Sequence, residues 1–112
     1  MKNLKTAAIE KATHLDFFNI AVSVDCVILG YEDKQLKVLL IKSDLEEFHD
    51  KWSLLGDLVK PDEDLEDAPY RVLQERTGLS DVFLEQVYTF GKVDRHPSGR
   101  VITTEEQNCN SQ

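Results

Sequence analysis

The 112-residue chain is poor in the residues that mark several common protein classes. Its two cysteines, Cys26 in an apolar run and Cys109 in a polar one, are typical of free thiols and not of a disulfide or a metal pair. Its apolar stretches are only a few residues long, so no segment predicts a membrane span. Its charged first residues are not typical of a secretory signal, which favours a cytoplasmic protein.

Basic residues are also scarce, because 13 Lys and Arg stand against 21 Asp and Glu, for a formal net charge of −8. Nucleic-acid phosphates are held by clustered Lys and Arg, and the sequence has no basic stripe. We therefore expect no direct binding of nucleic acid by this chain. A composition of 41% hydrophobic and 30% charged residues predicts one globular domain.

The first half of the chain predicts a β-hairpin after a leader. Residues 1–16 carry a weak helical pattern. Alternating, largely β-branched residues at 18–31 predict a strand, and a polar turn follows at 32–35. The second strand, at 36–42, is almost continuously apolar, which predicts burial on both of its faces. A charged loop at 43–51 ends the hairpin region.

The second half predicts one helix between short strands. A strand at 52–55 stops at Gly56, and helical periodicity begins at Leu65, with Asp64 as N-cap and Gly78 as the C-terminal stop. Pro69 leaves two alternatives open, because either the helix begins near it or its first turn is kinked. The remaining predicted segments are a strand at 82–90, a strand at 101–104 and a polar tail without periodicity at 105–112.

The most specific motif lies at 56–79, with the sequence GDLVKPDEDLEDAPYRVLQERTGL. It resembles the Nudix box, a loop–helix–loop signature, and by it the chain is identified as a member of the Nudix family. The resemblance implies an α+β fold, a Nudix-type α/β/α sandwich around a mixed sheet. It makes residues 17–104 a partial Nudix domain that is incomplete at its C-terminal side. The positions that match the box in register are Glu63, Arg71, Leu73, Glu75, Gly78 and Leu79.

Three departures from the box bear on chemistry: Asp57 replaces a glycine, and Val72 and Arg76 replace glutamates. In a Nudix enzyme the resemblance implies three helix carboxylates that hold Mg²⁺ or Mn²⁺ against a diphosphate. Two unit charges about 5 Å apart interact by about 3 kcal/mol at an effective dielectric of about 20, so Arg76 repels a metal ion. We expect no cofactor beyond weak Mg²⁺ at most, bound through Glu75 and Glu63.

Each of these helix residues also has a structural interpretation. Arg71 and Glu75 have the spacing of a surface salt bridge. Val72 lies beside an apolar stripe and is typical of a core residue. Arg76 is either a solvated residue near the negative end of the helix dipole or a built-in cation where a metal would sit.

The runs VSVDCVILGY, LKVLLIK and RHPSGRVIT extend the resemblance to the N-terminal domain of bacterial Nudix-related transcriptional regulators. This resemblance implies a pocket that senses a sugar such as arabinose or an ADP-ribose-type nucleotide. The family's C-terminal winged helix is absent here, and the polar end EEQNCNSQ is typical of a truncation. Candidate ligand contacts are Lys42, Arg95 and Arg100, with His96 beside them and Trp52 or Phe90 for stacking; each is also typical of surface or core.

Three functions follow as hypotheses. The first is a non-catalytic ligand-sensing domain of a regulator without its DNA-binding half. The second is a Mg²⁺-dependent hydrolase of nucleoside diphosphate-linked compounds that uses Glu75 and Glu63. The third is a non-functional relic. A homodimer stays open, because an exposed sheet edge invites pairing with another chain.

Overall fold

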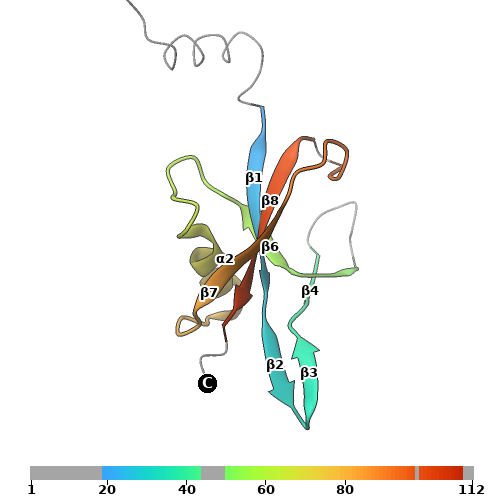
Figure 1. Ribbon diagram of the computed structural model, residues 1–112, viewed down its shortest axis with the longest axis vertical. Helices are drawn as coiled ribbons and strands as arrows, with labels where there is room; N and C mark the ends of the chain where they lie inside the picture. Colours follow the sequence, from blue (N-terminus) through green and yellow to red (C-terminus); the bar gives the residue numbers. More distant parts are fainter. Residues whose placement is uncertain (1–18, 44–49, 98, 110–112) are drawn as a thin grey trace, which may run out of the picture.

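A computed structural model describes residues 19–43, 50–97 and 99–109 of the chain. The predicted leader helix at 1–16 and the charged residues at 44–49 lie outside this part. The described elements form an α+β fold with a mixed sheet, as predicted (Figure 1). They are β1 (Ala21–Val27), β2 (Leu29–Glu32), β3 (Gln35–Val38), β4 (Ile41–Lys42), β5 (Trp52–Ser53), β6 (Leu55–Leu58), α2 (Ala68–Thr77), β7 (Leu84–Phe90) and β8 (Val101–Asn108).

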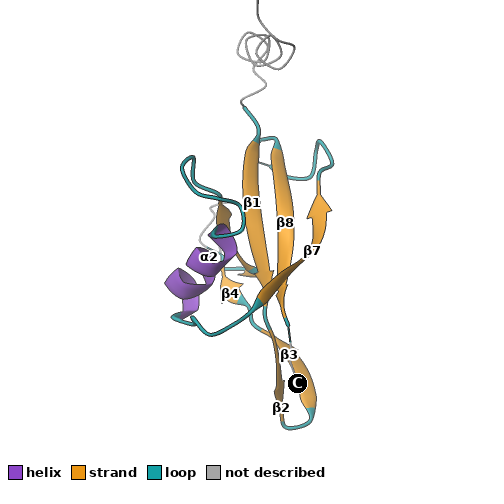
Figure 2. Ribbon diagram, turned by 60° about the vertical axis from the view of Figure 1, so that its left-hand side comes forward, coloured by secondary structure: helices purple, strands orange, loops and turns teal. Residues whose placement is uncertain are grey.

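The main sheet has four strands in the order β6-β1-β8-β7. Strand β1 pairs antiparallel with β6 and parallel with β8, and β7 pairs antiparallel with β8. The last strand of the chain therefore lies in the middle of the sheet, beside the first. Helix α2 lies on one face of this sheet, against β1 and β6 (Figure 2).

The core lies between α2 and the sheet. Val24 and Cys26 of β1, Leu55 of β6, and Val72 and Leu73 of α2 are all buried there, so the prediction of Val72 as a core residue is confirmed. Burial raises the pKa of the Cys26 thiol to about 12, which keeps it neutral. Both cysteines are free thiols, as predicted.

The hairpin differs from the sequence-based prediction in three ways. The expected second strand at 36–42 is divided at 39–40, because β3 pairs with β2 and β4 pairs with β5. The expected strand at 18–31 is divided at Ile28 into β1 and β2, because β2 leaves the main sheet and pairs with β3 alone. The expected burial of 36–42 is wrong, since Leu36 and Val38 are exposed on the projecting hairpin. The polar turn is confirmed: Asp33 and Lys34 have positive φ, as a two-residue hairpin turn requires.

The helix begins later than predicted. Asp67, not Asp64, is its N-cap residue, and Pro69 lies in its first turn, where a missing N–H costs no helical hydrogen bond. The first of the two alternatives for Pro69 is therefore the observed one. The predicted stop is confirmed, because Gly78 adopts a left-handed conformation and donates its N–H to the Gln74 carbonyl.

Three further strand predictions are wrong at their ends. Gly56 does not break a strand but lies inside β6, where a Cβ would collide with the Asp25 carboxylate. The expected polar tail at 105–112 is wrong for 105–108, since β8 continues to Asn108. Strand β7 pairs with all four of these residues and β1 pairs with 105–107, which outweighs their polar composition. Strand β7 begins two residues later than expected, at Leu84.

Asn108 closes the junction between the sheet and the hairpin. Its side-chain oxygen accepts the Leu29 N–H at 2.9 Å, and its side-chain nitrogen donates to the Leu29 carbonyl at 2.9 Å. One amide side chain thus pairs with Leu29 as a neighbouring strand would. Among the described residues, no helix is both long enough and apolar enough to cross a membrane.

Replacement of Asn108 by alanine tests this closure. We expect the Leu29 amide proton to lose its hydrogen-bond partner and to exchange with solvent at least about tenfold faster. Hydrogen exchange followed by NMR measures it. The Leu39 amide, which donates to the backbone carbonyl of Ile28, is the internal control and should keep its rate. Equal acceleration of both amides would mean that the whole hairpin loosens and that Asn108 has no local role.

Candidate functional site

The residual box residues converge on the Arg71 guanidinium. Its Nε and Nη2 donate to the two oxygens of Glu63 at 2.6 and 3.0 Å, and its Nη1 donates to Glu75 at 2.9 Å. Nη2 also donates to the Leu58 carbonyl at 2.9 Å, and Asp57 lies 3.5 Å from Nη1. The box loop and the box helix are therefore held together by one side chain, and the predicted Arg71–Glu75 pair is present.

This network shifts the pKa values of Glu63 and Arg71. The hydrogen bonds from Arg71 hold the pKa of Glu63 below its usual value of 4.5, with a smaller contribution from the Lys60 backbone. In the opposite direction, Glu63 and Glu75 raise the pKa of Arg71. Glu63 and Glu75, the two predicted metal ligands, are both bonded to a permanent cation.

The arrangement does not fit a catalytic divalent metal. Val72, at a position where the box has a carboxylate, is 1% exposed and packs in the core. Glu63 and Glu75 face Arg71, and Arg76 adds a second guanidinium on the same helix turn. Mg²⁺ needs several oxygen ligands in near-octahedral geometry. Within the described ranges, no group of three or more His, Cys, Asp or Glu side chains could hold such an ion.

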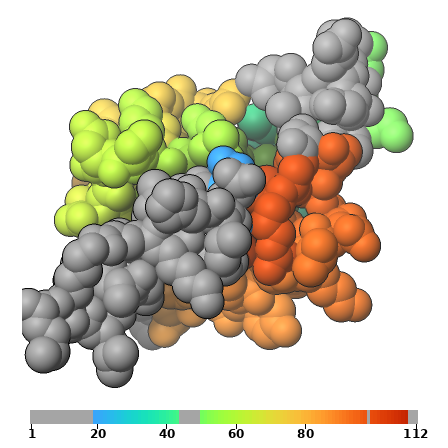
Figure 3. All heavy atoms as spheres, turned by 90° about the horizontal axis from the view of Figure 1, so that it is seen from above, coloured from blue at the N-terminus to red at the C-terminus, as the bar shows by residue number. Residues whose placement is uncertain are grey.

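A cavity of about 830 Å³ opens beside this network, largely over the face of the sheet opposite to α2. Successive residues of a strand point to opposite faces, so Ser23 and Asp25 turn toward the cavity while Val24 and Cys26 turn toward the helix. Other walls come from β6, from β4 and β5, from residues 95–96 and 99–101 and from Arg76 of α2. Figure 3 shows residues 91–97 and 99–101, in orange and red, and the loop between β6 and α2, in lime green, on either side of the start of β1.

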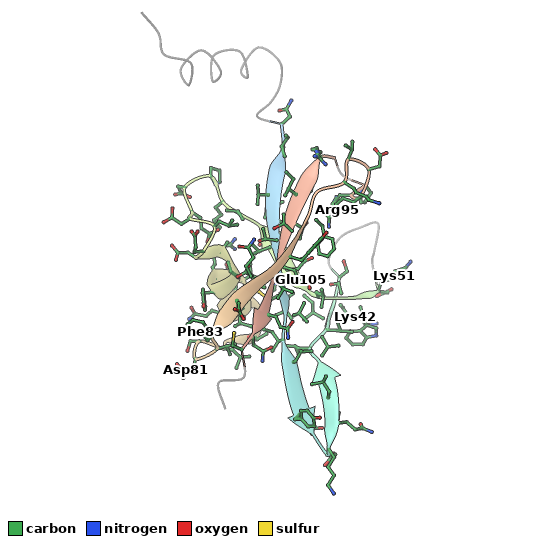
Figure 4. The ribbon with its side chains drawn as sticks, in the orientation of Figure 1. Lys42, Lys51, Asp81, Phe83, Arg95 and Glu105 are labelled. Atoms are coloured by element: carbon green, nitrogen blue, oxygen red, sulfur yellow. The ribbon has the colours of Figure 1, made fainter. Side chains whose placement is uncertain are left out.

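The cavity concentrates positive charge in an acidic chain. Lys51, Arg76, Arg95 and Arg100 line it, together with His96. Figure 4 places Arg95 and Lys51 on the side of β8 away from α2, whereas Asp81 and Phe83 lie near the helix. Cations that gather in a hollow attract anions more strongly than the same charges spread over a surface. The cavity is therefore suited to a ligand that carries phosphate.

Asp25 is the acidic residue at the floor of this cavity. Burial raises its pKa, and Glu105 adds to the rise, while Arg95 and His96 act against it. Its carboxylate lies against the backbone of Gly56, where any larger residue would collide with it. A carboxyl group in this position can accept hydrogen bonds from ligand hydroxyls.

Arginines hold the loop before β8 over the cavity. Arg95 donates to the Val101 carbonyl at 3.0 Å and to the Thr103 hydroxyl at 2.8 Å, and Thr103 is 2.6 Å from the Ser23 hydroxyl. Arg100 donates to the Gly91 carbonyl at 2.6 Å. Each arginine thus uses its Nη1 to hold the backbone of the cavity wall, and each also lines the cavity.

The structure brings most of the candidate ligand contacts together. Arg95, Arg100, His96 and Trp52 line the cavity. Lys42 and Phe90 do not; Lys42 lies over the Trp52 ring at 4.6 Å, and Phe90 lies 5.9 Å from the Arg95 guanidinium. Among the charged residues that line the cavity, sequence reasoning missed Asp25 and Lys51. A signal for the first existed, since one carboxylate interrupts the apolar run VSVDCVIL.

The chain is similar to one protein family and to several known proteins. The model of the family described as NUDIX domain matches residues 19–108. The ADPR responsive transcriptional repressor NtrR of Acinetobacter baylyi is 32% identical over 90 residues, which cover 79% of this chain and 36% of the repressor. The ADP-ribose pyrophosphatase of Methanocaldococcus jannaschii is 33% identical over 87 residues, covering 78% and 49%. The chain thus spans between a third and a half of these curated relatives.

Solved structures of regulators are similar as well. The NUDIX domain of Shewanella oneidensis NrtR complexed with ADP ribose has a TM-score of 0.73 and 33% identity, over 81% of this chain and 60% of that one. A crystal structure of Shewanella oneidensis NrtR has a TM-score of 0.71 and 34% identity, over 78% and 41%.

Replacement of Arg71 by glutamine tests the network that joins the box loop to the box helix. We expect Arg71→Gln to lower the unfolding free energy more than the control Lys37→Gln does. Lys37 forms an exposed salt bridge with Glu32, and such pairs contribute at most about 1 kcal/mol. Because the folded pKa of Glu63 is lowered, its contribution is present above pH 4.5 and is lost as the pH falls further. Denaturant unfolding of both variants across this range measures it. A difference from wild type that is independent of pH would contradict it.

Replacement of Asp25 by asparagine tests the cost of the buried carboxylate. A raised folded pKa means that ionisation above the usual value of 3.8 disfavours the folded state. We therefore expect Asp25→Asn to be more stable than wild type at about pH 7, and the gain to shrink as the pH falls toward 3.8. Thermal melts over the pH range measure the gain. A variant less stable than wild type at neutral pH would show that Arg95 and His96 outweigh burial.

Proposed function

The chain belongs to the NUDIX domain family, and from that premise we propose that its cavity binds an ADP-ribose-type nucleotide without hydrolysing it. One observation carries the proposal. The acids left in the box, Glu63 and Glu75, are bonded to Arg71, while the adjoining cavity is lined by cations. Hydrolysis in this family needs a metal held by acids, whereas ligand binding needs only a complementary cavity.

The size and chemistry of the cavity support a nucleotide. A volume of about 830 Å³ lies in the range of small-molecule sites. Lys51 and the lining arginines suit phosphates, and the carboxyl group of Asp25 suits ribose hydroxyls. Trp52 is 63% exposed and lines the cavity, so its ring is available to stack on a base.

The relatives support the same ligand class. One structural relative is a complex with ADP ribose, and the Acinetobacter relative is named as an ADPR responsive repressor. We extend the proposal to ligand sensing in a transcriptional regulator, of which this domain supplies the ligand-binding part. The Methanocaldococcus relative is named as a pyrophosphatase, which keeps hydrolysis of ADP-ribose as the second candidate function.

Thermal melts of the purified chain with ADP-ribose test the proposal. A ligand at about a hundred times its dissociation constant adds about 2.7 kcal/mol to the unfolding free energy, so the melting temperature should rise. No AMP should be released when Mg²⁺ is added. Trp52→Ala should weaken binding about tenfold by loss of stacking. The matched control is Phe83→Ala, because Phe83 is an exposed aromatic residue outside the cavity.

Two results would overturn this function. Release of AMP that depends on Mg²⁺ and is abolished by Glu75→Gln would establish the hydrolase instead. Stabilisation by arabinose, with none by ADP-ribose, would assign the cavity to a sugar without phosphate. Phosphate-free ribose serves as the control ligand, since it offers the same hydroxyls as ADP-ribose without the diphosphate.

A further inference from the structure

We infer that Arg76 takes the place of the divalent cation in this cavity, so that the diphosphate of the ligand binds directly to protein cations without metal. The inference deepens the proposed function, on which its ligand class rests. It starts from a disagreement between the box and the residues present: the metal does not fit, yet the cavity beside the box helix is suited to an anion.

Arg76 lies on the box helix at the wall of the cavity. Arg76 lies in the last turn of α2, directly after Glu75, and replaces the second glutamate of the box. Glu75 turns to Arg71, but Arg76 lines the cavity together with Gly56 and Asp57 of β6. The side chain at this box position therefore faces the ligand space, and here it brings a positive charge where the box has a negative one.

A guanidinium group can bind a diphosphate without a metal ion. Arginine stays protonated at any physiological pH and presents its N–H donors as a planar fork that matches two phosphate oxygens. A carboxylate at this position can approach a diphosphate only through a bridging cation, since both are anions. A guanidinium needs no bridge, because it neutralises the phosphate and donates hydrogen bonds to it.

The surrounding charges agree with this assignment. Lys51, Arg95 and Arg100 line the same cavity and add positive charge. Of the lining acids, Asp57 is 3.5 Å from Arg71 and accepts the Leu58 N–H, and Asp25 lies against the backbone of Gly56. A divalent cation in this cavity would be repelled by these side chains and would find few carboxylate oxygens as ligands. An anion is attracted by the same side chains.

Titration with inorganic pyrophosphate in excess EDTA is the test, with ¹⁵N-labelled full chain observed by NMR. Pyrophosphate isolates the anion site from recognition of base and ribose. We expect saturable shifts for wild type in EDTA, including the Arg76 side-chain Nε–H, so that binding does not require added Mg²⁺. Arg76→Gln should weaken binding about tenfold or more, and Arg76→Lys should restore part of the loss.

The matched control is Lys37→Gln, which removes the same unit of charge on the exposed hairpin, outside the cavity. It should bind pyrophosphate as wild type does; an equal loss in both variants would reduce the role of Arg76 to net charge and overturn the inference. Pyrophosphate binding that needs Mg²⁺, no binding at all, or an unchanged affinity in Arg76→Gln would also overturn it. If pyrophosphate binds as expected and ADP-ribose does not, the inference stands and the proposed ligand falls.

Discussion

The Arg71 guanidinium is the contact on which the box region depends. It bonds Glu63, Glu75 and the Leu58 carbonyl at once, and thereby ties the loop after β6 to α2. The same bonds engage Glu63 and Glu75, the two acids that match the box in register. Helix α2 also supplies Val72 and Leu73 to the core and Arg76 to the cavity wall. One helix therefore joins the core, the box loop and the cavity.

Much of the fold follows from local rules in the sequence. The fixed spacing from Glu63 to Leu79 identifies the box, and the family model confirms it. The hairpin turn and the stop at Gly78 were predictable because positive φ values favour particular residues at particular positions. The apolar stripe located Val72 in the core, since side-chain periodicity reports which face of a helix is buried.

The errors concern features that depend on distant parts of the chain. Residues 105–108 look like a polar tail, yet they form strand because β7 pairs with all of them and β1 pairs with 105–107. Leu36 and Val38 look like core residues, yet the hairpin leaves the sheet. Of the site, Arg95 and Arg100 were predictable by type, whereas Lys51 and the place of Asp25 under Gly56 were not. In both segments the pairing partners, and not the hydropathy of the residues, determine whether the segment forms a strand of the main sheet.

The order of the strands has a consequence for how the chain reaches this structure. Strand β8 is the last described element in sequence, yet it occupies the middle of the sheet, and Asn108 reaches back across 79 positions to Leu29. Contacts between residues so far apart in sequence form slowly, because a large loop must close first. On a ribosome, the edge of β1 that pairs with β8 would stay unfilled until residues 101–108 are synthesised. Until then, the strand that supplies Ser23 and Asp25 to the cavity presents an unpaired edge, which is open to wrong pairing.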